Sequence, residues 1–181
     1  MSKAVMLSIR PKWCEKIASG KKTVEVRKTK PKLKPPFKCY IYCTKDKNNH
    51  FWTGKRYSYA DDHSHNAFDK IGSGKIIGEF ICNQIYELAP LNYAPDDVEK
   101  QARLTREEIV NYLKGTGYGW HISDLKIYDT PKELAEFHTQ KKCKSCSKSG
   151  YESTACSYDE NCMVPVAITK APQSWCYVEE V

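Results

Sequence analysis

The sequence lacks a long apolar run, an N-terminal export signal and the length for two domains. No eighteen consecutive apolar residues occur among its 181 residues, which excludes a membrane-spanning helix. The opening MSKAVMLSIR contains no apolar segment of the kind that precedes a signal-peptide cleavage site. A chain of this length suits one ordinary domain with a real core. We therefore expect a single cytoplasmic domain over residues 1–181, with no membrane partner.

Acidic residues are scarce at the N-terminal end. Residues 1–38 hold twelve Lys or Arg against two acids, Glu15 and Glu25, whereas the remaining residues hold seventeen against twenty. The net charge of +7 therefore comes from the N-terminal part. Phosphate neutralisation by Lys and Arg supplies most of the non-specific affinity for nucleic acids. The asymmetry favours a polyanionic partner, although lysines that only keep a small protein soluble give the same pattern.

The nine cysteines are not expected to form a disulfide framework, because cytosolic thiols stay reduced. Four of them lie within twenty positions, at Cys143, Cys146, Cys156 and Cys162. Since tetrahedral zinc takes four thiolates, this cluster predicts a closed, structural zinc site. The second pair is separated by five residues rather than two, and His138 is an alternative ligand. Disulfides and unliganded thiols stay open as alternatives.

A short helix, a glycine stop and a charged strand fill residues 8–28. Pro11 suits the first helical position, and Gly20 suits a C-terminal cap because glycine reaches the left-handed conformation. After the glycine the period changes to two, and Val24 and Val26 share one face. The opposite, polar face consists of Thr23, Glu25 and Arg27. That face is either a solvated edge or a site for a polar ring or a phosphate, and composition alone favours the edge.

The rest of the chain alternates strand patterns with short helices. Strands are expected at residues 4–9, 22–28, 38–44, 74–85, 118–129, 164–168 and 174–178, and helices at residues 11–19, 105–113 and 130–137. The strand at 74–85 is apolar on both faces and should be central, so its Glu79 must be paired, have a shifted pKa or lie at the wet mouth of a barrel. Thr105 with Glu108 matches a capping box, as does Thr130 with Glu133.

Two stretches have the character of insertions, at about residues 45–73 and 138–163. The first mixes aromatic and basic residues without a period. This composition suits contact with single-stranded nucleic acid, and it equally suits a plain tyrosine-rich hairpin. The second contains the four-cysteine cluster.

The segment Gly20-x-Lys22-x-x-Glu25-x-Arg27, placed after a short helix, resembles the signature of the ASCH domain, a member of the PUA-like superfamily. The similarity extends to three further stretches, at residues 8–11, 74–82 and 118–129. It implies an α+β fold built on a small PUA-like β-barrel with short flanking helices, to which the cysteine-rich insertion is added.

The resemblance implies a nucleic-acid-binding module that recognises RNA, or a modified nucleobase, in a pocket lined by this motif. PUA-like domains are associated with such recognition, in which bases stack on rings and their edges contact polar groups. The candidate ligand-binding residues are Arg10, Lys21, Lys22, Glu25, Arg27 and His121.

A function of a different class stays open beside RNA binding. Some small ASCH proteins are amidohydrolases that remove an acyl group from a modified cytidine, using a lysine, a threonine three residues later and a more distant glutamate. Lys22 matches the lysine, but Glu25 occupies the threonine position. Thr23 is the nearest hydroxyl, and Glu99 is the nearest candidate for the distant glutamate. The sequence therefore leaves open whether the protein is an enzyme.

Overall fold

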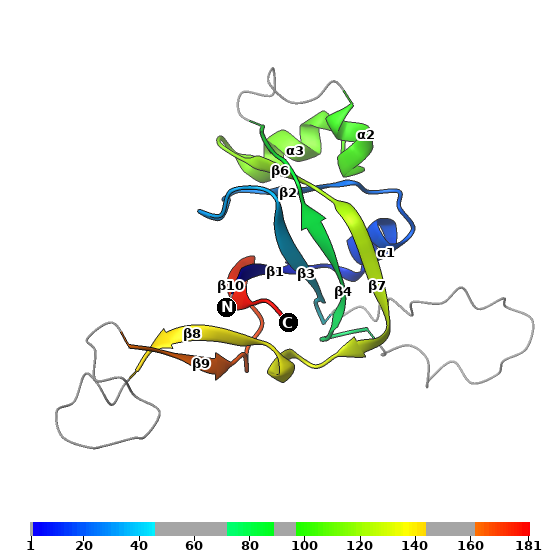
Figure 1. Ribbon diagram of the computed structural model, residues 1–181. Coiled ribbons are helices and arrows are strands. Elements are labelled where there is room, and N and C mark those ends of the chain that lie inside the picture. The colour runs from blue at the N-terminus through cyan, green and yellow to red at the C-terminus, as the bar shows by residue number, and fades with distance from the viewer. Residues whose placement is uncertain (1, 46–71, 89–96, 144–161) are drawn as a thin grey trace, which may run out of the picture.

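The computed structural model describes residues 2–45, 72–88, 97–143 and 162–181 (Figure 1). The strands are β1 (Lys3–Ile9), β2 (Val24–Arg27), β3 (Phe37–Cys43), β4 (Ile76–Cys82), β5 (Ile85–Glu87), β6 (Tyr118–His121), β7 (Ser123–Lys132), β8 (His138–Lys142), β9 (Met163–Ala167) and β10 (Trp175–Glu179). The helices are α1 (Pro11–Ala18), α2 (Val98–Ala102), α3 (Arg106–Leu113) and the 3₁₀ helix η2 (Leu134–Glu136). The expected α+β class is confirmed.

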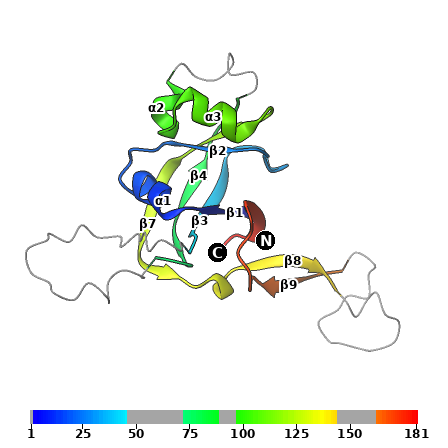
Figure 2. The same ribbon diagram turned by 180° about the vertical axis from the view of Figure 1, so that it is seen from behind.

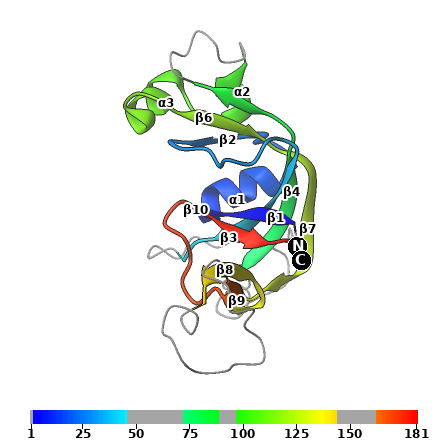
Figure 3. The ribbon, with the colours of Figure 1, turned by 60° about the vertical axis from the view of Figure 1, so that its left-hand side comes forward.

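The strands form three sheets, ordered β10-β1-β3-β4-β7, β2-β6-β5 and β8-β9. Figure 3 shows the layers: α2 and α3 cover the outer side of the three-stranded sheet, and α1 lies between that sheet and β1. The view from behind in Figure 2 agrees, with α1 next to both β1 and β2. In the described ranges no helix has the length and apolar content to cross a bilayer.

The five-stranded sheet is buried on both faces along its three inner strands, β1, β3 and β4. Cys39, Ile41 and Cys43 alternate along β3 and pack against α1 in the main core, as the sequence pattern predicts. On the other face Tyr40 packs edge-on against Phe137, with ring centroids 4.8 Å apart. Burial on both faces explains why the strands of this sheet are rich in apolar residues without strict alternation.

β4 lies between β3 and β7, so the prediction of a central strand is confirmed. Its Glu79 accepts a hydrogen bond from the Tyr128 hydroxyl at 2.5 Å and lies 4.0 Å from the Lys38 ammonium, which supplies the partner that a half-buried carboxylate needs. A Cβ atom added at Gly78 would lie only 2.4 Å from the Lys126 carbonyl oxygen of β7. Glycine is therefore required here by the close approach of two backbones.

One predicted capping box is confirmed and the other is wrong. The Glu108 amide donates to Thr105 Oγ1 at 3.1 Å, and the Thr105 amide donates to Glu108 Oε2 at 2.7 Å, at the start of α3. The helix expected at residues 130–137 is not formed, because β7 continues to Lys132, which pairs with Ile76 of β4. Only the short helix η2 follows β7, and the capping box at its start is formed by Glu133 and Glu136.

The two larger sheets do not close into a barrel through backbone pairing within the described residues, so the expected PUA-like barrel is not confirmed. Side chains of β10 contact the segment that follows β2. The Trp175 indole donates to Thr29 Oγ1 at 2.9 Å, and the Lys32 amide donates to the Tyr177 hydroxyl at 2.7 Å. We call this line of side-chain contacts the seam.

The expected insertions lie mostly outside the described residues, but the chain is closed at the base of each. The Gly74 amide donates to the Cys43 carbonyl at 2.8 Å, and the Cys43 amide to the Lys75 carbonyl at 2.9 Å. The Cys143 amide donates to the Cys162 carbonyl at 2.9 Å. The described ends of the second stretch include β8 and the start of β9, which pair as a hairpin.

Candidate functional site

Strand β2 is buried on both faces. Val24 and Val26 pack against α2 and α3 in a separate apolar cluster. Glu25 is paired in register with Trp120 of β6, so these two side chains share the face that meets the main core. The solvated edge favoured by composition is therefore wrong. β2 is not solvated because both of its faces are covered, by α2 and α3 on one side and by α1 and the large sheet on the other.

Lys22, Glu25 and Arg27 form an ion-paired group that we call the charged row. Glu25 Oε2 lies 3.3 Å from Lys22 Nζ, and Glu25 Oε1 lies 3.0 Å from Arg27 Nη2. The three residues are only 2%, 7% and 6% exposed. One carboxylate thus serves two buried cations, and with both cations protonated the row carries a net positive charge.

The Lys22 side chain is fixed by α2. Its ammonium donates to the Ala102 carbonyl at 2.7 Å, at the helix end where carbonyl groups lack helical partners. Burial lowers the pKa of Lys22, and the neighbouring Glu25 carboxylate opposes that shift. Lys22 is therefore easier to deprotonate than a surface lysine, while the contact with Glu25 favours the charged form.

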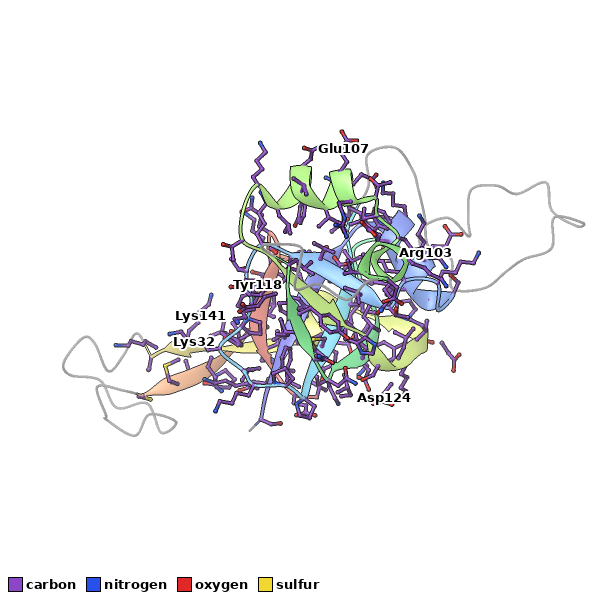
Figure 4. All side chains as sticks on the ribbon, turned by 90° about the horizontal axis from the view of Figure 1, so that it is seen from above. Lys32, Arg103, Glu107, Tyr118, Asp124 and Lys141 are labelled. Carbon is purple, nitrogen blue, oxygen red and sulfur yellow. The ribbon has the colours of Figure 1, made fainter. Side chains whose placement is uncertain are left out.

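Arg27 joins three parts of the chain. Its Nη2 donates to the Ser8 carbonyl at 2.8 Å, and its Nη1 lies 3.3 Å from both the carbonyl and the hydroxyl of Ser174, just before β10. The planar guanidinium suits this task because it carries several donors in a fixed fork. Figure 4 labels Arg103, whose Nε donates to the Lys21 carbonyl at one end of β2, and Tyr118, which pairs with Arg27 at the other.

Two buried donors beside the row have no hydrogen-bond partner in the described part of the chain. They are Arg27 Nε and the Trp120 indole nitrogen. Buried polar groups are satisfied in the great majority of cases, so two orphan donors on neighbouring strands need an explanation. A ligand that presents hydrogen-bond acceptors would satisfy both.

A series of aromatic rings begins at Trp120, which is paired in register with Glu25 of the row. The Trp120 ring lies 5.8 Å from Phe37 and 6.0 Å from Trp175, measured between centroids, and Trp175 lies 5.4 Å from Tyr177. Trp120 is fully buried, whereas Trp175 and Tyr177 at the seam are partly exposed. Interactions of the charged row are strengthened by these apolar surroundings, because the local dielectric constant is low.

Three buried thiols are held in the protonated form, and one of them, Cys14, interacts with Glu25 of the row. Burial raises the pKa of Cys14, with smaller contributions from Cys43 and from the Glu25 carboxylate. Burial also raises the pKa of Cys39 and brings that of Cys82 to about 12. Because the thiolate is the nucleophile and the metal ligand, these three cysteines act as core residues.

Of the four residues considered for acyl hydrolysis, the structure brings Lys22 and Glu25 together. Thr23 is tied to its surroundings through its backbone, its amide donating to the Gln101 carbonyl at 3.0 Å. The Glu99 carboxylate accepts from Arg106 Nε at 2.6 Å, at the link between α2 and α3. Among the described residues, neither the Thr23 nor the Glu99 side chain makes a hydrogen bond or an ion pair with the charged row.

The remaining candidate ligand residues lie outside the row. Arg10 and Lys21 are exposed, at the start of α1 and just before β2. His121 lies in register with Val24, on the face of β6 opposite to Trp120, and its Nδ1 is 2.7 Å from the side-chain oxygen of Asn83. Arg10 and Lys21 thus remain available at the surface, whereas His121 is turned away from the row.

The hairpin of β8 and β9 brings two cysteines of the predicted zinc cluster to facing positions. Cys143 and Cys162 follow and precede the last strand pair, Lys142 with Met163, and are joined by the backbone hydrogen bond described above. Cys146 and Cys156 lie outside the described residues. Within those residues no group of three or more potential metal ligands occurs.

Several residues of the site have no local sequence signal. Ser174 meets Arg27 across 147 positions, and the Ala102 carbonyl meets Lys22 across 80. The position of Trp120 beside Glu25, with an indole nitrogen that has no hydrogen-bond partner among the described residues, follows only from the register of β6 against β2. The strand period placed Glu25 and Arg27 on one face of β2, but it carries no information on which residue of another strand lies beside them.

Comparisons with known proteins agree with the resemblance seen in the sequence. Residues 7–89 match the ASCH domain family, which confirms the expected relationship for that part of the chain. Two variants of an ASCH protein from Zymomonas mobilis have similar structures. One is 16% identical, with a TM-score of 0.54, covering 98% of this chain and 89% of the other. The second is 18% identical, with a TM-score of 0.50, covering 74% and 77%. No curated protein matches the sequence.

Proposed function

With an ASCH domain matched over residues 7–89 as the premise, we propose that this protein is a cytoplasmic nucleic-acid-binding module that recognises RNA, or a modified nucleobase within it, at the charged row. The observation that carries the proposal is a buried, net-positive ion group with two donors, Arg27 Nε and the Trp120 indole nitrogen, that have no partner among the described residues. Nucleobases present carbonyl oxygens and ring nitrogens, which are the acceptors that such donors need.

The charge distribution supports the same class of ligand. The first 38 residues, which contain the whole charged row, carry twelve basic residues against two acids. An extended excess of this kind attracts a phosphate backbone and raises its local concentration. The row then contributes selectivity for a base, and the surrounding surface contributes affinity.

Binding of a labelled single-stranded RNA at several salt concentrations tests the proposal. The logarithm of the association constant should fall linearly with the logarithm of the salt concentration. Trp120→Phe removes the orphan donor and keeps an aromatic ring, so it should weaken binding. Trp175→Phe is the matched control, because that indole already donates to Thr29. Absence of salt-dependent binding by the wild-type protein would refute the proposed function.

Acyl hydrolysis is the second candidate, favoured by one observation. Burial lowers the pKa of Lys22, and a carboxylate lies 3.3 Å from its ammonium, which suits a lysine that takes part in acyl transfer. Incubation with acylated cytidine, followed by detection of free cytidine, distinguishes the two functions. Turnover that Lys22→Met abolishes would favour the enzyme. No turnover together with salt-dependent RNA retention would favour the binding module.

A structural zinc ion in the four-cysteine cluster is a separate proposal. It is supported by the spacing of the cysteines and by the facing positions of Cys143 and Cys162 at the hairpin end. Four thiolates would close the coordination shell, so the metal would stabilise the loop without acting in catalysis. Metal analysis after dialysis should give about one zinc per chain, as expected for a closed site. A metal-free protein of unchanged stability would refute it.

A further inference from the structure

Three lysine ammonium groups surround the ring of Trp13 on α1. Their Nζ atoms lie 4.5 Å (Lys12), 4.8 Å (Lys16) and 5.1 Å (Lys22) from the ring centroid. Lys12 is exposed and Lys16 is partly exposed, whereas Lys22 is buried in the charged row. Trp13 is itself partly exposed and packs against the main core. The ring therefore connects the surface of α1 with the charged row.

The positive charge around Trp13 is poorly balanced. Lys22 is paired with Glu25, but among the described residues neither Lys12 nor Lys16 makes an ion pair. Glu15 is the one acidic residue of α1. An ammonium group is attracted to the negative face of an indole ring, so the ring holds these like charges close together. A group with this charge attracts phosphate.

We infer that Trp13 is a stacking platform for one base of a single-stranded RNA, and that Lys12 and Lys16 contact the phosphates beside that base. The inference rests on the proposed RNA-binding function and identifies the side from which RNA approaches the charged row. The stacked base takes the place of the Lys12 and Lys16 ammonium groups on the ring, and these two groups then pair with phosphates. Ring stacking and charge neutralisation therefore act together.

Selectivity for single strands follows from this arrangement. A base reaches the face of an indole ring only when it is separated from its stacked neighbours in the nucleic acid. A duplex would offer Lys12 and Lys16 its phosphates but would give no stacking on Trp13. Duplex RNA should therefore bind more weakly than the same sequence as a single strand.

Substitution of Trp13 tests the stacking contact. The probe is a fluorescein-labelled single-stranded RNA of mixed sequence, and binding is measured by fluorescence anisotropy. Trp13→Leu keeps an apolar contact with the core but removes the ring, and it should weaken binding about tenfold, as expected for the loss of one stacked base. Trp13→Phe keeps an aromatic ring and should retain most of the wild-type affinity. Denaturation curves establish that each variant is folded.

The two lysines are tested by the salt dependence. Each phosphate contact on a single strand contributes about 0.7 to the slope of log K against log salt, so Lys12→Gln with Lys16→Gln should reduce the slope by about 1.4. The matched control is Lys141→Gln with Lys142→Gln, which makes the same change in charge at the two exposed residues of β8. Figure 4 shows Lys141 on the opposite side of the molecule from Arg103, which contacts the residue before the row.

The outcomes separate this inference from the function on which it rests. A wild-type protein that does not bind the RNA overturns both. The other result has the wild-type protein binding with the expected salt dependence, Trp13→Leu binding equally well, and the two lysine double variants having the same slope of log K against log salt. That result overturns only the role of Trp13 and its lysines. If Trp13→Leu fails to fold, the lysine pairs and the comparison of single-stranded with duplex RNA decide.

Discussion

At the scale of residues, the charged row depends on Glu25. Its two carboxylate oxygens are divided between Lys22 and Arg27, and all three side chains are almost completely removed from water. Removing one partner of a buried ion pair is far more costly than removing an exposed one, because a buried charge is then left without compensation.

Glu25→Gln should lower the free energy of unfolding by about 3 kcal/mol, since it leaves two buried cations without a counter-charge. Urea denaturation measures the change. Glu87→Gln is the control, because its pair with Lys30 is exposed, and it should leave the midpoint unchanged. Equal midpoints for both variants would contradict the structural importance of the row.

Arg27→Lys should lower the free energy of unfolding by about 2 kcal/mol, because a single ammonium cannot reproduce the contacts with Ser8, Ser174 and Glu25. Thermal and urea unfolding should both report the loss. Arg106→Lys is the control, since its pair with Glu99 is more exposed and is served by one nitrogen. A similar small effect for both would show that the fork of Arg27 adds nothing to stability.

At the scale of elements, local sequence patterns were sufficient where the element is long or well capped. β1, α1, β3, β4 and α3 were predicted from periodicity, Pro11 and the capping box at Thr105. α2 is only five residues long, and a helix of that length has no period to detect. The strand ending at Lys132 overrode a local helix signal because pairing with β4 is a tertiary contact.

Gly78→Ala should lower the free energy of unfolding by about 2 to 3 kcal/mol, because the added methyl group would overlap the β7 backbone, which cannot give way as a flexible side chain would. Gly20→Ala is the matched control. Gly20 has φ of +70° and no atom within 4 Å of the added Cβ, so only backbone strain of about 1 kcal/mol is expected. Equal losses would show that the Gly78 contact is relieved by a backbone shift.

At the scale of the whole molecule, the site depends on contacts that no local pattern contains. The sequence placed Lys22, Glu25 and Arg27 near one another, since all three lie within six consecutive positions. Burial of the row required β6, α2 and the start of β10 to meet β2, over separations of 80 to 147 residues for the hydrogen bonds involved. The family resemblance predicted the class of fold, but it did not predict the seam of side chains.

Alkaline pH should destabilise the folded protein through Cys82. The folded thiol has a pKa of about 12 against an ordinary value of 9.0, so the unfolded chain loses its proton first as the pH rises. Unfolding then releases a proton, and the free energy of unfolding falls by about 1.4 kcal/mol per pH unit within that window. Denaturation curves in reductant at pH 8 to 11 should show a smaller slope for Cys82→Ala than for the wild type. Identical slopes would contradict the shift.

The hydrogen bonds that join the two ends of each predicted insertion have a consequence for variation in the length of these stretches. Cys43 with Lys75, and Cys143 with Cys162, bring the two ends of each intervening stretch together with hydrogen bonds that belong to the body of the protein. Doubling the length of a loop between fixed ends costs only about 0.6 kcal/mol. A change in the length of either stretch should therefore cost little loop-closure free energy and leave the core as it is.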